Sequence, residues 1–299
     1  MSADGPIDLR TALGWFPEPR DVVGVAGPDA LPYLQGQLSQ DVDALAVGSS
    51  ARSFVLQPKG KVDAWVRVTR IAADEVVLDV DGGHGDALVA RLRRFLLRTK
   101  ADVDALDWRA VAIRGPGSAE AIAAGGGDDV LVAPAGWPGV DGVDLLGRAV
   151  GPPPGVPEVD ASVYESLRIR SGVPRMGAEL TDATIPAEAG RWVIDGSVSF
   201  TKGCFTGQEL VARIDSRGGH VPRQLRGLVT GAEELPPVGA PVVVDGAEIG
   251  RVTSSAPAPG TGRALALAYV GRAVTPPVAA EVRRGDGGLP VTVVDLPMD

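Results

Sequence analysis

The residues best suited to chemistry surround the single cysteine of the chain, Cys204. Lys202 lies two residues before it, and nearby glycines allow tight backbone turns and a close approach by a ligand. Thr206 and Glu209 have the spacing of a capping box, which predicts a helix that begins at Thr206. The positive end of that helix and the lysine ammonium would both favour a thiolate. The segment is therefore a candidate site for a nucleophilic or redox-active cysteine, although a lone cysteine is more often a small buried hydrophobic residue.

The composition disfavours several other chemistries. One cysteine and two histidines cannot form an internal disulfide, a four-thiolate iron–sulfur cluster or a closed structural zinc site, so no metal site is expected. A hydrolytic triad is also disfavoured, because the sequence has no Gly-x-Ser-x-Gly motif. The formal net charge of −9 repels polyanions, so we expect no direct contact with nucleic acid.

The length of 299 residues suggests two or three domains. No stretch approaches eighteen consecutive apolar residues, which predicts no transmembrane helix. The first residues include an early acid and no apolar core of a secretion signal. We therefore expect a monomer in the cytoplasm with no membrane partner.

The elements that position the cysteine follow from hydrophobic spacing. The first half of the chain mixes helix and strand signals, and the residues from 221 onward read as short strands of a small barrel or sandwich, with Asp245-Gly246 as a hairpin turn. Before residue 221, we expect helices over 29–38, 86–98 and 160–171 and strands over 53–56, 62–69, 75–80 and 109–113.

The helix predicted over 86–98 carries a cluster of basic residues. The cluster consists of Arg91, Arg93, Arg94 and Arg98. We interpret it as a solvated helix face, with a contact for RNA or an anionic ligand as the alternative.

The segment from Lys202 to Glu209, Lys-Gly-Cys-Phe-Thr-Gly-Gln-Glu, resembles the K-G-C-(Y/F)-x-G-Q-E signature of the YgfZ family. That family is the folate-binding branch of the glycine-cleavage T-protein (aminomethyltransferase) superfamily. The resemblance spans roughly residues 20–298. Further stretches agree with the family in order along the chain, at 33–42, 58–61, 167–174, 185–190 and 250–255.

The resemblance implies an α+β fold with three domains arranged around a central folate pocket. The implied units are a first α+β domain over 1–107, a second over 108–220 that carries the cysteine motif, and a C-terminal β-barrel over 221–299. The first two units could exchange segments. The implied cofactor is tetrahydrofolate or a derivative.

The resemblance also implies a role in assembling or repairing iron–sulfur clusters in other proteins, with an indirect effect on tRNA modification. The implied partners are a reduced folate and iron–sulfur client or assembly proteins. Cys204 and Lys202 are the predicted catalytic pair, with the lysine stabilising the thiolate. Tyr164 is predicted to stack on a pterin ring, although ordinary helix packing is the alternative. The rest of the predicted cofactor-binding set is Gly203, Phe205, Gly207, Gln208, Glu209 and Arg213.

The sequence also departs from the superfamily pattern. Where T-proteins carry an Asp-Asp pair, this chain has Ala64 and Trp65, with Asp63 one residue early. Arg170 stands where the helix motif often carries an acid. These departures count against a folate-dependent aminomethyl or one-carbon transferase, but that function stays an alternative. A folate-binding scaffold without catalysis is a further alternative. Whether the protein is an enzyme is left open, and an enzyme would be of the folate-dependent transferase type.

Overall fold

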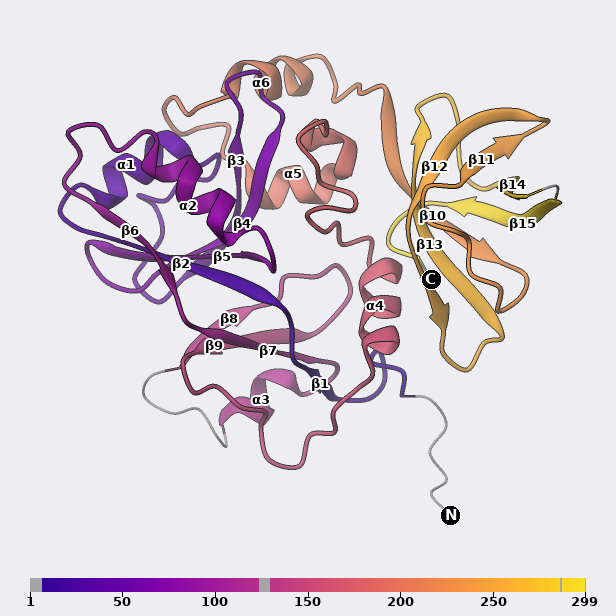
Figure 1. Cartoon of the computed structure of the whole chain (residues 1–299), viewed down its shortest axis with the longest axis horizontal. Helices are drawn as coiled ribbons and strands as arrows, with labels where there is room; N and C mark the ends of the chain where they lie inside the picture. Colours follow the sequence, from indigo (N-terminus) through magenta and orange to yellow (C-terminus); the bar gives the residue numbers. More distant parts are fainter. Residues whose placement is uncertain (1–6, 124–129, 286, 299) are drawn as a thin grey trace.

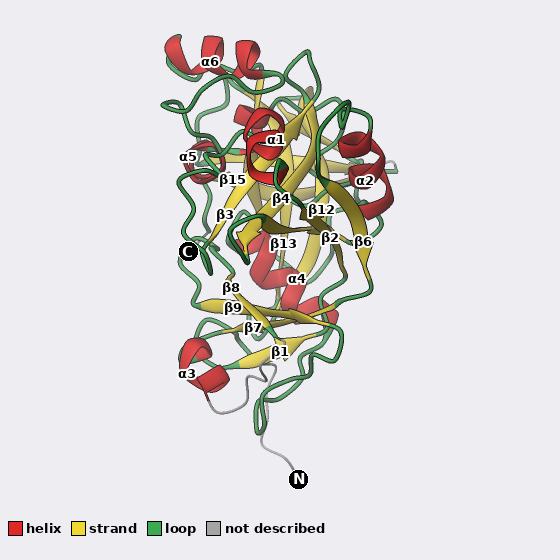
Figure 2. Cartoon of the chain, turned by 90° about the vertical axis from the view of Figure 1, so that its left-hand side faces the viewer, coloured by secondary structure: helices red, strands yellow, loops and turns green. Residues whose placement is uncertain are grey.

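The computed structural model describes residues 7–123, 130–285 and 287–298 and arranges them as two antiparallel sheets beside a closed barrel (Figure 1). Viewed from the side, the five-stranded sheet lies above the four-stranded sheet (Figure 2). The helix α4, Ala161–Arg170, packs against strands β12 and β13 of the barrel. None of the helices in the described ranges is long and apolar enough to cross a membrane.

The five-stranded sheet has the strand order β3-β4-β5-β2-β6. Its alternating Val-rich strands form because branched side chains suit a pleated surface that packs on helices. The strands are β2 (Arg20–Ala26), β3 (Ser50–Leu56), β4 (Val62–Arg70), β5 (Glu75–Asp81) and β6 (Asp102–Leu106). The helices of this unit are α1 (Ala30–Gln37) and α2 (Gly85–Arg93).

Strand β4 is buried on both of its faces. Val62 and Val66 face the core, as the alternation predicts, and are fully buried. Trp65 and Arg67 on the opposite face are also buried, with exposed fractions of 4% and 1%. The second face is covered because the four-stranded sheet approaches it: Arg67 donates to the carbonyl oxygen of Pro134, the last residue of β8.

The four-stranded sheet has the order β1-β7-β9-β8. Its strands are β1 (Gly14–Phe16), β7 (Arg109–Arg114), β8 (Leu131–Pro134) and β9 (Gly142–Gly147), and α3 (Ser118–Ala123) follows β7. The first strand of the chain therefore crosses over to pair with β7 in the second sheet.

The segment around the cysteine crosses in the other direction, onto the five-stranded sheet (Figure 1). It contains the 3-10 helix η1 (Pro186–Ala189), α5 (Arg191–Ser197) and α6 (Gln208–Ser216). Helix α5 packs on β3. The two sheet units thus exchange segments, while the boundaries at 107/108 and 220/221 stay predictions.

The C-terminal strands close into a barrel with the order β10-β13-β12-β11-β14-β15. The hairpin turn predicted at Asp245-Gly246 is confirmed, since both residues have positive φ, 49° and 81°. The bounds are β10 (Arg223–Thr230), β11 (Pro241–Val244), β12 (Ala247–Ala258), β13 (Arg263–Gly271), β14 (Val278–Arg284) and β15 (Gly287–Val294). Arg168 of α4 donates to the Ser254 hydroxyl at 2.8 Å, which ties the barrel to the rest of the molecule.

Two of the three predicted helices agree well with the structure. Asp29 and Asp160 are the N-cap residues of α1 and α4. The helix predicted over 86–98 is shorter, because α2 ends at Arg93. Arg98 has a left-handed backbone with φ 60°, which no continuing helix could contain.

Candidate functional site

A cavity of about 490 Å³ lies where the two sheets and α4 meet. Side chains from β1, β2, β3, β4, β5 and α4 contribute to its wall, so the fold brings distant parts of the sequence together there. The lining residues are Phe16, Glu18, Pro19, Arg20, Arg52, Trp65, Asp81, Gly82, Trp137, Ala161, Tyr164, Glu165, Arg168, Val173, Pro174, Arg175 and Met176.

A buried ion network joins the two sheets beside this cavity. Arg67 of β4 lies 2.9 Å from the Asp79 carboxylate and 2.6 Å from that of Asp144 in the other sheet. Arg20 also binds Asp79 at 2.6 Å, and Arg114 binds Asp144 at 2.7 Å. Burial by itself would raise the pKa of both carboxyls, but the guanidinium groups outweigh it and hold each pKa below its usual range.

Tyr164 forms part of an aromatic wall. Its ring stacks on Phe16 with centroids 4.5 Å apart and 19° between the planes, and it lies 5.3 Å from the Trp137 ring. Its hydroxyl accepts a hydrogen bond of 3.0 Å from Arg114. Tyr164 thus lines the cavity while its ring packs against protein neighbours, and stacking on a pterin stays a prediction.

Arg52 is a cation of the cavity wall without a carboxylate partner. In the described chain it forms no ion pair; its Nη2 donates to the Ala135 carbonyl at 3.1 Å, and its guanidinium lies 4.8 Å from the Trp65 ring centroid. Burial and the neighbouring Arg67 and Arg20 lower the pKa of Arg52 to about 10. The group remains a cation at neutral pH and has hydrogen-bonding capacity left for an anionic ligand.

The cysteine motif forms a separate region at the turn between β3 and β4. Gly207 has a left-handed φ of 80°, and a Cβ there would lie 2.5 Å from the Gln57 carbonyl oxygen. Gly60 is equally confined, since its Cβ would lie 2.5 Å from Leu210. Two motifs far apart in the sequence, 58–61 and 202–209, therefore meet at glycines that allow close backbone contact.

The capping box predicted at Thr206 and Glu209 is wrong. Helix α6 begins at Gln208 with Gly207 as its N-cap, and no side chain caps it. The left-handed turn at Gly207 places Thr206 outside the helix, where its N–H donates to the Gly36 carbonyl. Because the N-cap is Gly207 and not Thr206, Cys204 is one residue farther from the first helical turn than predicted, which weakens the influence of the helix dipole.

Cys204 itself is exposed, whereas Lys202 is 9% exposed. The lysine ammonium donates three hydrogen bonds to backbone carbonyls around the end of α1, at 2.7 Å to Gln35, 2.8 Å to Leu38 and 2.8 Å to Gln40. Burial lowers the pKa of Lys202 to about 8, partly offset by Asp41 and Asp43. Because an ammonium has three protons, all of its donors are engaged by the backbone. Stabilisation of a thiolate by Lys202 stays a prediction without support from this geometry.

The other predicted binding residues divide between loop and surface. Phe205 is buried, and its N–H donates to the Gln208 side chain at 3.3 Å. Gly203, Glu209 and Arg213 are exposed. Of the predicted cofactor-binding set, only Tyr164 is among the described residues that line the cavity.

The basic cluster on α2 is partly neutralised. Arg91 lies 2.9 Å from Asp63, and Arg93 lies 2.7 Å from Asp104. These pairs favour a structural and solvated role over a contact for RNA. Among the described residues, no group of three or more His, Cys, Asp or Glu side chains could hold a metal ion.

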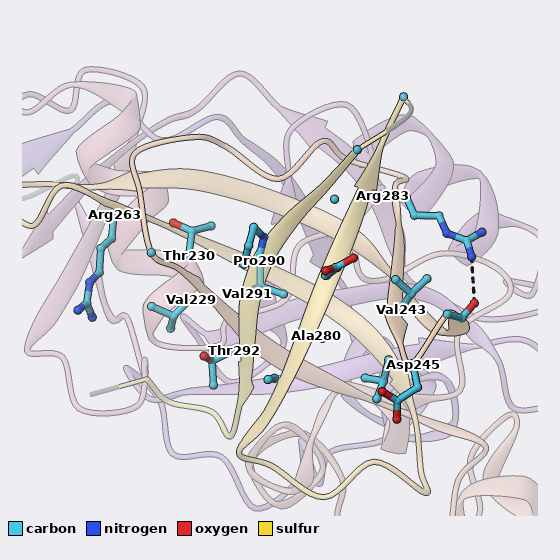
Figure 3. Close-up of a pocket in the computed structure, with 18 residues that line it drawn as sticks. Val229, Thr230, Val243, Asp245, Arg263, Ala280, Arg283, Pro290, Val291 and Thr292 are labelled. Atoms are coloured by element: carbon cyan, nitrogen blue, oxygen red, sulfur yellow. Dashed lines mark hydrogen bonds between the residues drawn. The ribbon is translucent and has the colours of Figure 1, made fainter.

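A larger hollow, about 960 Å³, lies on the barrel (Figure 3). Its wall comes from β10, β14, β15 and the β11–β12 turn, where Arg283 donates to the Gly246 carbonyl at 3.0 Å. None of the described residues that line it is aromatic or belongs to the predicted site. The smaller central cavity is therefore the better candidate for a ring-containing ligand.

Sequence reasoning missed the residues that build the central cavity, above all Arg20, Arg52 and Arg67. A weak signal was present in β4, where Trp65 and Arg67 lie on the more polar face of the strand, with Asp63 and Thr69. A large aromatic residue on such a face indicates burial, but the partner acids come from other strands and cannot be paired from the sequence.

Comparisons with known proteins agree with this architecture. Residues 223–299 match the family described as the glycine cleavage T-protein C-terminal barrel domain. An aminomethyltransferase of Streptomyces avermitilis is 29% identical, over 92% of this chain and 83% of its own length. The tRNA-modifying protein YgfZ of Edwardsiella ictaluri is 28% identical, over 77% of this chain and 73% of its own. The crystal structure of the glycine cleavage system aminomethyltransferase T of Bartonella henselae has the same fold, with a TM-score of 0.80, 23% identity and coverage of 97% and 87%.

The fold, the barrel and the relatives all support the resemblance to the glycine-cleavage T-protein superfamily. The expected fold, a T-protein-like arrangement with a C-terminal barrel, is confirmed. The YgfZ relative supports the resemblance of the cysteine motif to the YgfZ signature.

Proposed function

We propose that this protein binds a reduced folate in the central cavity and serves iron–sulfur cluster assembly or repair in other proteins. The observation that carries the proposal is the cavity wall, which combines aromatic rings with Arg52, a buried cation without an ion pair in the described chain. The protein would act as a cytoplasmic monomer, and its effect on tRNA modification would be indirect, through client enzymes that carry clusters.

The residues present fit a folate. The volume of about 490 Å³ lies within the range of roughly 300–1,000 Å³ typical of small-molecule pockets. Four arginines and three carboxyl side chains line the cavity, a positive excess in a chain of net charge −9. This excess suits the carboxylates of a folate tail, while Phe16, Trp65 and Trp137 supply apolar surface for its rings. A bound reduced folate supplies one-carbon chemistry at its ring nitrogens.

Cys204 would act on the cluster of a partner protein. Its thiol is exposed and lies outside the set of described residues that line the cavity. One thiol can supply one ligand to iron but cannot hold a cluster alone, so the cluster is the substrate and belongs to the client. Folate binding and thiol chemistry would therefore occupy separate regions of the molecule.

Folate-dependent aminomethyl transfer is the second candidate, because several relatives, including that of S. avermitilis, are aminomethyltransferases. The absence of the Asp-Asp pair counts against it, since β4 has Ala64 and Trp65 there, each 4% exposed. Formation of methylene-tetrahydrofolate from an aminomethyl donor would support this candidate over the first.

The folate proposal is tested by calorimetric titration with tetrahydrofolate under anaerobic, reducing conditions. We expect micromolar or tighter binding by the wild type and by Cys204→Ser. Arg52→Gln should bind about tenfold more weakly, because it loses one charged contact. Arg263→Gln, a matched change in the barrel hollow, should bind like the wild type. A wild type that does not bind would overturn the folate proposal.

The cluster proposal is tested in cells that lack the protein. Wild type should restore the activity of a cluster-dependent enzyme, and Cys204→Ser should not. If Cys204→Ser restores activity fully, the thiol plays no part, and a folate-binding scaffold becomes the better description.

A further inference from the structure

Three carboxyl groups, those of Asp79, Asp144 and Glu18, face the ion network beside the cavity, and they differ in how closely cations contact them. Asp79 and Asp144 each contact two guanidinium groups at distances between 2.6 and 2.9 Å. Within the described ranges, Glu18 has one ion pair and it is loose: its Oε2 lies 3.7 Å from Nη2 of Arg114, beyond hydrogen-bond distance. The Glu18 side chain is nevertheless only 15% exposed and lines the cavity.

The local sequence explains why this carboxyl is held in place. Glu18 lies in the link between β1 and β2, where the chain passes from one sheet to the other. Pro17 and Pro19 flank it, and a residue before proline is restricted to extended backbone. The preceding Phe16 and the following Arg20 both line the same cavity. Glu18 is thus presented to the cavity by a restricted backbone.

The other carboxyl groups of the wall are already committed. Asp81 accepts from Arg20 at 2.6 Å and from the Met176 N–H at 2.8 Å. Glu165 accepts from Arg168 at 2.7 Å and lies 3.2 Å from Arg175. Among the described residues that line the cavity, Glu18 is therefore the carboxyl without a close cation partner, and it has acceptor positions left for a ligand.

The groups around Glu18 shift its pKa in opposite directions. Burial is the main influence and raises its pKa, and the charge of Asp144 raises it further. Arg20 and Arg114 lower it, while Asp81 adds a small rise. Tyr164 also faces it as a hydrogen-bonding neighbour. The net pKa is raised, so Glu18 takes up a proton closer to neutral pH than an exposed glutamate does.

We propose that Glu18 accepts the N–H donors of the ring of a bound reduced folate and that its ionisation state controls the affinity. The proposal rests on the proposed folate function. A 2-amino-4-oxo pyrimidine ring carries two adjacent N–H groups, which match the two oxygens of a carboxylate in a bidentate pair. Ala64 and Arg170 leave two other positions without an acid, and Glu18 would supply this acceptor from the link between β1 and β2.

The test measures the affinity for 5-formyltetrahydrofolate at several pH values, from about 8 to about 5.5. Because the carboxylate is the accepting form, wild-type affinity should fall as Glu18 becomes protonated, approaching tenfold per pH unit at the acidic end. Glu18→Gln should bind at least tenfold more weakly at pH 8 and should lose this pH dependence. Using one ligand for both proteins cancels the titration of the ligand itself.

Two further variants keep the result interpretable. Glu165→Gln removes a carboxyl from the same wall and should retain the wild-type pH dependence, because that group is tied to arginines. Glu18→Asp keeps a carboxyl and should retain the pH dependence with weaker binding. If Glu18→Gln does not fold, an unaltered slope in Glu18→Asp supports the proposal and a flat one overturns it.

The outcomes separate the two proposals. No binding by the wild type overturns the folate function and the role of Glu18 together. Wild-type binding with the same pH slope in Glu18→Gln leaves the folate function standing and overturns the role of Glu18. An affinity that rises as the pH falls would also overturn it, because the ligand would then need the protonated acid.

Discussion

The central cavity and the loop around Cys204 use charge in different ways. In the cavity, Arg67, Asp79 and Asp144 hold one another across two sheets and are almost completely buried. In the loop, Lys202 holds only backbone carbonyls, and the thiol two residues later is exposed. The comparison teaches that the cavity is a pre-organised pocket suited to a small molecule, whereas the loop leaves its thiol accessible from outside the molecule.

The largest expected effect comes from removing Arg67 from the buried ion network. Arg67→Met removes the shared guanidinium and leaves Asp79 and Asp144 with one guanidinium partner each, from Arg20 and Arg114, which should lower the free energy of unfolding by about 3 kcal/mol. Urea denaturation measures this loss of stability. Arg93→Met, which removes an exposed pair with Asp104, should cost less than about 1 kcal/mol. Equal losses in both variants would contradict the distinction between buried and exposed pairs.

Acid should weaken the same network more gradually. The pKa of Asp79 and that of Asp144 are held below the unfolded value, which is about 3.9 for aspartate. Their contribution to stability is therefore fully present above that value and is lost as the pH falls below it toward the folded pKa. Urea denaturation from pH 7 to pH 3 should show this loss, and Arg67→Met should show a shallower one. A wild-type stability that is flat below pH 4 would refute the prediction.

In the loop, Lys202→Met tests whether the lysine supports the backbone or the thiol. Removing three charge-assisted hydrogen bonds to α1 and its following residues should lower the free energy of unfolding by about 1–3 kcal/mol. Lys59→Met, at an exposed position, is the matched control and should cost almost nothing. The rate of Cys204 alkylation by iodoacetamide should change little. A large drop in that rate with unchanged stability would restore the thiolate role.

The smallest expected effect on stability is that of Cys204→Ser. The side chain is exposed and the substitution changes one atom, so the free energy of unfolding should stay within about 0.5 kcal/mol of wild type. Thermal denaturation checks this. A larger loss of stability would show that Cys204 is a packing residue, and the contrast between a buried cavity and an exposed cysteine loop would no longer hold.

Much of the local structure could be predicted from the sequence, because it depends on short-range patterns. The helices expected over 29–38 and 160–171 form as α1 and α4, and the strand expected over 62–69 forms as β4. The cysteine motif and its companions identified the superfamily. The capping box predicted at Thr206 does not form, because Gly207 packs against the β3–β4 turn with a left-handed backbone and the helix begins only at Gln208.

By itself, the sequence determined the order of elements, the barrel and the absence of the thiols needed to hold a cluster. Only the tertiary structure decided which charges meet. Arg67 and Asp144 are 77 residues apart in the chain and come into contact because the four-stranded sheet packs against the face of β4 that carries Arg67. Tertiary contacts likewise place the Lys202 ammonium among backbone carbonyls and leave acceptor positions of the Glu18 carboxyl facing the cavity. Hydrogen-bond partners depend on proximity in space and not on spacing in the sequence.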